Sequence, residues 1–158
     1  MPFNKLVAAM SLTIAMLTSF SPLAITAVEA KPDSKASKKA AAAKEITWES
    51  SWKEATAKAK ATGKPIMLDF YTDWCTWCKR LDRDVYSHPA IISQLGSRMI
   101  FLKVNLERSP AENNLALRYK AGAFPTVVVL DSQKNEKGRI EGYQPPERFL
   151  VSILDTLR

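Results

Sequence analysis

The only two cysteines of the chain, Cys75 and Cys78, are separated by two residues. An apolar run, residues 65–71, precedes them, and a charged run with helical spacing, residues 79–85, follows. A Cys-x-x-Cys pair at the point where a strand leads into a helix is the arrangement used for thiol–disulfide exchange. At a helix N-terminus, unpaired amides and the helix dipole would stabilise a Cys75 thiolate. Cys78, one turn later on the same face, would resolve a mixed disulfide.

Two other uses of the cysteine pair remain open, namely buried structural thiols and half of a zinc site. A tetrahedral zinc site needs about four ligands, and His88 is the only histidine in the chain. We therefore expect no metal, and no cofactor beyond a redox-active disulfide between Cys75 and Cys78. Buried structural thiols have no need of a strand-to-helix junction, so the position of the pair favours redox use.

Asp69 is an acid inside the apolar run, six residues before Cys75. A buried carboxylate is costly unless it is neutral or paired. Its unbroken apolar neighbours favour burial, and burial would raise its pKa. The alternative is an edge position with the Asp69 side chain in solvent.

The remaining pattern predicts an α/β domain over residues 45–158, with the element order β-α-β-α-β-α-β-β-α. We expect strands at residues 45–48, 66–71, 99–104, 126–130 and 139–141. We expect helices from Ser50 or Ser51 to Gly63, from Cys75 to Gly96 with an interruption at residues 87–89, from Ser109 to Gly122, and from Pro145 onward. Ser109 and Glu112 have the spacing of a capping box. The last two strands should form a hairpin.

The chain has 158 residues and a net charge of +7. More than half of that excess lies in residues 31–44, which contain five lysines and one aspartate and have no apolar periodicity. We interpret this segment as a flexible linker. The folded domain alone lacks a strongly basic composition, so we expect no nucleic-acid partner. We expect the domain to be a monomer.

Residues 1–30 have the pattern of a secretory signal peptide, with Lys5 before an apolar run at residues 6–20 and small residues up to a predicted cleavage site after Ala30. An uncleaved membrane anchor is the alternative, because residues 6–28 are long enough for the roughly 20 residues that a membrane span needs if Pro22 is tolerated. Either reading predicts an exported, periplasmic or otherwise extracytoplasmic domain.

Two separated motifs resemble the thioredoxin superfamily: Trp-Cys-Thr-Trp-Cys-Lys at residues 74–79 and Phe-Pro-Thr at residues 124–126. The resemblance covers residues 45–158 in the family's order of elements, and it implies a thioredoxin fold with a central mixed β-sheet flanked by helices. More narrowly, residues 64–95 are similar to the C-terminal periplasmic domain of DsbD and related exported thioredoxin-like proteins.

The resemblance implies roles for several residues near the cysteines. Asp69 would lie beneath the site and carry the proton of Cys78. Pro125 would be cis and face the disulfide, so that an extended substrate could pair with the backbone of Phe124. From spacing alone, Pro125 could equally be a trans proline that opens a strand.

Trp74 precedes Cys75 and Trp77 lies between the cysteines, and the two rings predict an apolar platform for substrate, with ordinary packing as the alternative. Thioredoxins proper have Gly-Pro between the cysteines, where this chain has Thr76 and Trp77. The resemblance implies a thiol–disulfide oxidoreductase that acts on disulfide-containing proteins, mainly as a reductant reloaded by a membrane thiol donor. The alternatives are a disulfide oxidase or isomerase, and a thioredoxin-fold binding, chaperone or metal-handling module.

Overall fold

The computed structural model describes residues 44–158. The expected signal, and all of the expected linker except Lys44, lie outside the described residues. The described strands are β1 (Ile66–Tyr71), β2 (Ile100–Asn105), β3 (Thr126–Leu130) and β4 (Glu136–Glu141). The helices are α1 (Trp52–Thr62), α2 (Thr76–Leu81), α3 (Pro89–Leu95), α4 (Pro110–Arg118) and α5 (Pro146–Thr156), with a π-helical segment, η1 (Asp82–Tyr86), directly after α2.

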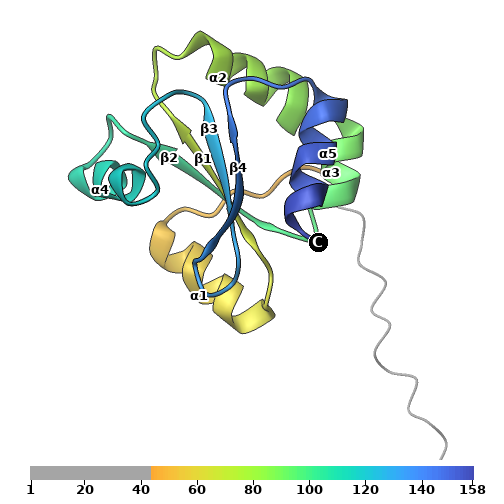
Figure 1. Ribbon diagram of the computed structural model, residues 1–158, viewed down its shortest axis with the longest axis horizontal. Coiled ribbons are helices and arrows are strands. Elements are labelled where there is room, and N and C mark those ends of the chain that lie inside the picture. The colour runs from red at the N-terminus through yellow and green to blue at the C-terminus, as the bar shows by residue number, and fades with distance from the viewer. Residues whose placement is uncertain (1–43) are drawn as a thin grey trace, which may run out of the picture. The chain divides into compact units, whose positions relative to one another are not determined.

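The strands form a mixed sheet in the order β2-β1-β3-β4 (Figure 1). The central strand β1 is parallel to β2 and antiparallel to β3, and β3 pairs with β4 as a hairpin. The expected mixed sheet and closing hairpin are therefore confirmed. Because β1 has neighbours on both sides and helices on both faces, nearly all of its side chains are buried.

Alternating residues of the strands build one apolar core on each face of the sheet. On one face, α2, η1, α3 and α5 cover a core that includes Met67 and Phe149. On the other face, α1 and α4 cover a core that includes Leu68, Ala55 and Leu115 (Figure 1). Among residues 44–158, no helix has the length and apolar character needed to cross a membrane.

The expected strand at residues 45–48 is reduced to a single bridge. Trp48 pairs with Phe101 of β2, and the Glu49 N–H donates to the Phe101 carbonyl at 2.8 Å. The chain then turns into α1, where the Ser51 hydroxyl accepts from the Glu54 N–H at 3.2 Å. This early helix cap ends the pairing, so the outer edge of β2 stays open beyond Phe101.

Local signals predicted where the helices begin and where α1 ends, but α4 ends at Arg118, before the expected Gly122. Gly63 ends α1 with φ of 70°, a left-handed conformation that favours glycine. The capping box at α4 is confirmed, because the Glu112 N–H donates to Ser109 Oγ at 3.3 Å. The helix expected after Cys75 differs in one respect: its second half is the π-helical segment η1.

Candidate active site

The two cysteines form a disulfide at the start of α2, with an S–S distance of 2.06 Å. Cys75 is the N-cap residue of α2, and its sulfur accepts from the Cys78 N–H at 3.1 Å. Both expected positions are confirmed, at the helix N-terminus and one turn later. In the reduced protein this amide would favour a Cys75 thiolate, because a hydrogen bond to the charged form stabilises it.

Asp69 lies in β1 and is 1% exposed, so the expected burial is confirmed and the solvent-exposed alternative is wrong. Burial raises the pKa of Asp69, and the nearby Lys103 ammonium opposes part of that rise. Lys103 stands directly opposite Asp69 in the β1–β2 register, and its Nζ lies 2.7 Å from Asp69 Oδ2. The other oxygen, Oδ1, is buried without a hydrogen-bond partner among the described residues.

Lys103 also contacts a second carboxylate, with its Nζ 2.5 Å from Asp82 Oδ1. Its ammonium lies 4.8 Å, 4.9 Å and 5.2 Å from the ring centroids of Tyr71, Trp48 and Tyr86, within range for cation–π attraction. Burial lowers the pKa of Lys103, but the two carboxylates outweigh it and leave the pKa above its usual value. The ammonium therefore stays charged between the two acids.

This ion-pair cluster connects Asp69 to the helix that carries the cysteines. Asp82 follows Cys78 by four residues, so both lie on the same face of the continuous α2–η1 helix. Sequence reasoning missed Lys103 and Asp82. A lone charge inside the apolar run of β2 is the signal that marks Lys103, and it is the same signal that marks Asp69.

Trp74 and Trp77 are 68% and 52% exposed, respectively, which argues against ordinary core packing for either ring. The Trp77 ring lies 5.6 Å from the Tyr143 ring, and the Arg80 guanidinium lies 5.4 Å and 4.7 Å from these two ring centroids. The structure thus brings Tyr143, which precedes α5, beside the cysteine helix. Sequence reasoning missed Tyr143, because no local pattern marks this contact.

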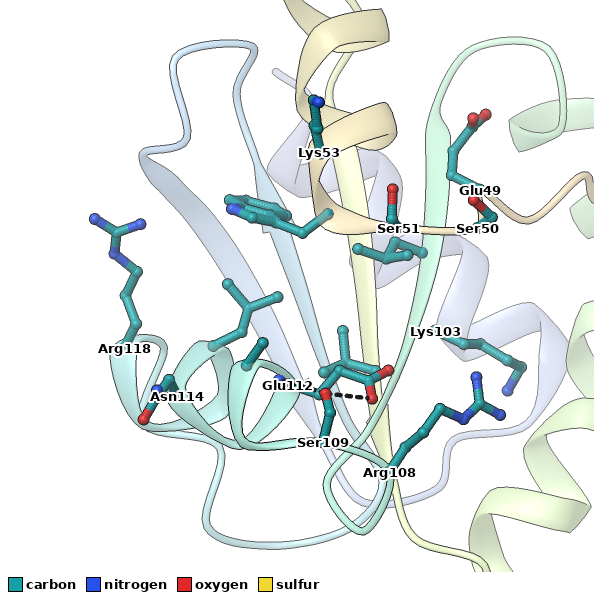
Figure 2. Close-up of a pocket in the computed structure, with 15 residues that line it drawn as sticks. Glu49, Ser50, Ser51, Lys53, Lys103, Arg108, Ser109, Glu112, Asn114 and Arg118 are labelled. Carbon is teal, nitrogen blue, oxygen red and sulfur yellow. Dashed lines mark hydrogen bonds between the residues drawn. The ribbon is translucent and has the colours of Figure 1, made fainter.

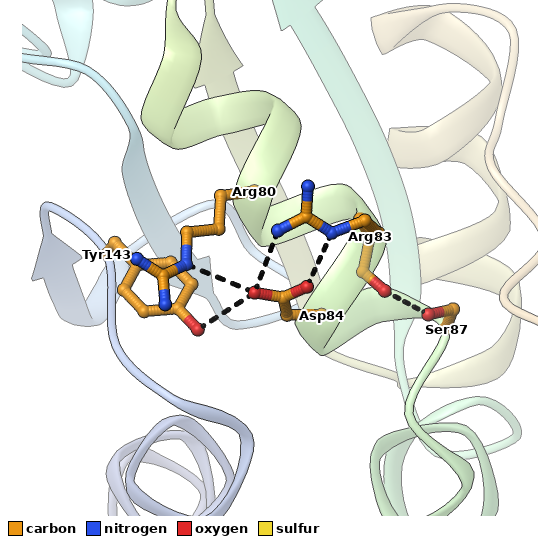
Figure 3. Close-up of polar contacts among 5 residues, drawn as sticks. All are labelled: Arg80, Arg83, Asp84, Ser87 and Tyr143. Carbon is orange, nitrogen blue, oxygen red and sulfur yellow. Dashed lines mark hydrogen bonds and ion pairs between the residues drawn. The ribbon is translucent and has the colours of Figure 1, made fainter.

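A small polar network holds this stack in place (Figure 3). Asp84 Oδ2 accepts from Arg80 Nε at 3.1 Å and from the Tyr143 hydroxyl at 3.4 Å, while Oδ1 accepts from Arg83 Nε at 2.8 Å. The hydrogen bond from Arg83 lowers the pKa of Asp84, which keeps it charged at neutral pH. The charged carboxylate orients Arg80 across the two rings.

The Phe124–Pro125 peptide bond is cis, which confirms the conformation implied by the resemblance. The Pro125 carbonyl accepts from the Gly142 N–H at 2.8 Å, so the loop before β3 is tied to the segment that follows β4. The Trp74 and Phe124 rings meet edge to face at 6.2 Å. This contact brings the proline loop beside the residue that precedes Cys75.

The sequence of this domain matches known proteins. The family model of the thioredoxin-like domain matches residues 52–156. The thiol:disulfide interchange protein DsbD of Photorhabdus laumondii is 35% identical over 88 residues, which cover 54% of this chain and 15% of that protein. DsbD of Cronobacter sakazakii is 33% identical over 104 residues, covering 65% of this chain and 18% of that protein. This chain thus spans less than a fifth of the length of these relatives.

Solved structures agree with the sequence match. A thioredoxin from Thermus thermophilus superposes with a TM-score of 0.64 at 28% identity, covering 72% of this chain and 88% of that one. Two further structures share the fold. The DsbH oxidoreductase superposes with a TM-score of 0.65 at 24% identity, covering 73% of this chain and 87% of that one. The oxidised C-terminal domain of Neisseria meningitidis DsbD superposes with a TM-score of 0.56 at 23% identity, covering 70% of this chain and 98% of that one. The chain belongs to the thioredoxin-like family of thiol–disulfide oxidoreductases.

Proposed function

We propose that this protein is an exported thiol–disulfide oxidoreductase that acts mainly as a reductant of protein disulfides. The observation that carries the proposal is the Cys75–Cys78 pair at the N-terminus of α2, with the buried Asp69–Lys103 pair connected to the same helix. The DsbD relatives support disulfide exchange, since their printed name is thiol:disulfide interchange protein. The reductant direction is proposed because no histidine lies between Cys75 and Cys78. The exposed rings of Trp74 and Trp77 are proposed to contact the substrate protein.

In the proposed reaction, the Cys75 thiolate attacks one sulfur of a substrate disulfide. A mixed disulfide forms, and the other substrate sulfur leaves as a thiolate that takes a proton from water. The Cys78 thiol passes its proton to the Asp69 carboxylate, and its sulfur attacks the Cys75 sulfur. The bond between Cys75 and the substrate sulfur breaks, the departing substrate sulfur takes up the proton from Asp69, and the substrate leaves as a dithiol. Cys75–Cys78 becomes the disulfide that the structure contains.

Each cycle consumes two electrons and two protons, so a thiol donor must reload the protein by the same exchange in reverse. We propose that this donor is a membrane protein and that residues 1–30 direct export, with residues 31–44 as a linker to the domain. The signal-like pattern of residues 1–30 supports export. N-terminal sequencing of the protein purified from an extracytoplasmic fraction tests the signal, with a mature start at Lys31 as the expected result.

Reduction of insulin disulfides tests the activity. The dithiol-reduced protein should accelerate precipitation of the insulin B chain, and the Cys75→Ser variant should not. Precipitation at the uncatalysed rate with both proteins would instead identify a binding module. A measured potential near that of a strong oxidant, about −120 mV, would contradict the reductant direction.

Substrate trapping extends this test. The Cys78→Ser variant retains the attacking sulfur but cannot resolve the mixed disulfide, so it should accumulate covalent adducts that dithiothreitol releases. A Cys75→Ser/Cys78→Ser double variant is the matched control and should accumulate none. Adducts at the same level in the control would contradict attack by Cys75.

A further inference from the structure

The outer edge of β2 has backbone hydrogen-bonding groups that no strand covers. Ile100 and Leu106 donate toward β1, to the carbonyls of Pro65 and Tyr71 at 2.9 Å and 3.1 Å. In a parallel ladder, alternate residues turn both backbone polar groups to the same side, so Lys103 turns its N–H and C=O outward. Among residues 44–158, the only strand pairing on this side of β2 is the bridge at Phe101. The outward carbonyl of Asn105 accepts from the Arg108 N–H at 3.2 Å.

A groove of about 940 Å³ lies along this open edge (Figure 2). Its floor includes Leu102, Val104 and Leu115, and its walls come from the start of α1, with Trp52, and from α4. The Lys103 side chain points to the opposite face of the sheet, toward Asp69, so Lys103 borders the groove with its backbone. An apolar floor beside free backbone groups is the combination that binds an added strand.

The rim of the groove is positively charged. Lys53, Arg108 and Arg118 line it, and all three are exposed and have no ion-pair partner among the described residues. Its two carboxylates are already engaged, Glu49 by Lys58 and Glu112 by the capping box. Both α1 and α4 begin at this groove, so their dipoles add partial positive charge.

We propose that this groove and the open edge of β2 bind an extended acidic segment of another protein. The segment would add as a short strand at Lys103, with every second side chain toward Leu102 and Val104. These side chains would be apolar in the middle of the segment, with a carboxylate at its end toward Arg108. The charge of the rim argues against the chain's own residues 31–44 as the occupant, because that segment contains five lysines and one aspartate. The proposal does not depend on redox activity.

A cysteine-free probe tests the proposal separately from disulfide exchange. The probe is a fluorescein-labelled eight-residue peptide, Ser-Glu-Ser-Val-Ser-Val-Ser-Glu, in which the valines and glutamates occupy every second position and so face the same side of a strand. It is titrated with the oxidised protein by fluorescence anisotropy. The variant Arg108→Glu should weaken its binding by roughly tenfold. The control Arg148→Glu makes the same charge change on α5, which covers the other face of the sheet, and should bind as the parent does.

Two further measurements locate the binding mode. Amide NMR shifts should move at Lys103 and Asn105 and stay unchanged at Trp74 and Trp77. The same peptide with alternate backbone nitrogens methylated should bind at least about tenfold more weakly, because it cannot pair as a strand.

Several results would overturn the proposal. The first two are failure of the probe to bind the protein, and equal affinity of the probe for the charge-reversed variant and the control. The other two are binding of a peptide with lysine in place of glutamate as tightly as the probe, and amide NMR shifts confined to residues near the cysteines. A dimer in sedimentation, with the amide of Lys103 protected from exchange in the absence of peptide, would assign the edge to a second copy of the chain instead.

Discussion

Replacing Lys103 by methionine would test the buried Asp69–Lys103 ion pair. The substitution keeps an unbranched apolar side chain against the rings of Trp48 and Tyr71 and removes only the ammonium. The pair is 2.7 Å long, with Asp69 almost fully buried and Lys103 23% exposed. Without Lys103, the Asp69 carboxylate would be left buried and uncompensated.

The magnitude follows from the geometry. Two unit charges about 4 Å apart attract by about 4 kcal/mol at an effective dielectric constant of about 20. Part of this is offset, because removal of Lys103 also removes the cost of burying its ammonium. We therefore expect the Lys103→Met variant to lose about 2 to 3 kcal/mol of unfolding free energy at pH 7.

The loss should depend on pH with a definite sign. Burial already raises the pKa of Asp69, and Lys103 is the main influence that lowers it, so the variant raises this pKa further. A carboxyl with a raised pKa in the folded state stabilises the protein most below its unfolded value of about 3.9, and that stability is lost as pH rises through the folded value. The deficit of the variant should thus be largest at neutral pH and shrink toward pH 4.

Urea unfolding of the oxidised protein, measured at several pH values, provides the test. In an Asp69→Asn background, Lys103→Met should cost less than about 1 kcal/mol, because no buried charge is left to compensate. An equal loss in both backgrounds, or a loss that grows as pH falls, would refute the reasoning.

Three further predictions concern other parts of the domain. Trp77→Ala should lower kcat/KM for insulin reduction about fivefold, since it removes about 1 kcal/mol of substrate contact; an unaltered kcat/KM would exclude Trp77 from the platform. Gly138→Ala places a Cβ 2.4 Å from Thr156 Cγ2 and should cost about 1 to 3 kcal/mol in urea unfolding, with recovery on adding Thr156→Ser and its smaller side chain. Ser109→Ala removes the cap of α4 and should cost about 1 kcal/mol, whereas Ser109→Asn should cost less.

Local sequence predicted those features of the site that depend on residues adjacent in the chain. Cys75 and Cys78 are set by the junction between β1 and α2, and the burial of Asp69 follows from its apolar neighbours in the strand. The cap at Ser109 and the stop at Gly63 likewise depend on a few adjacent residues.

The parts that sequence reasoning missed depend on pairing between distant segments. Lys103 is 34 residues from Asp69, and only the register of β1 against β2 shows that the two charges meet. Tyr143 reaches Asp84 across 59 residues. The segment at residues 45–48 has β-prone composition, but the helix cap that follows limits it to one bridge.

The pairing of Asp69 with Lys103 also bears on how the chain folds. A slip of β2 by one residue against β1 would turn the Lys103 side chain to the opposite face, toward the core under α1 and α4. Such a misaligned sheet would bury an ammonium among apolar side chains and leave Asp69 without its partner, a penalty of several kcal/mol. The pair therefore selects one alignment of the two parallel strands during folding, so a single buried charge pair discriminates against misfolded sheets.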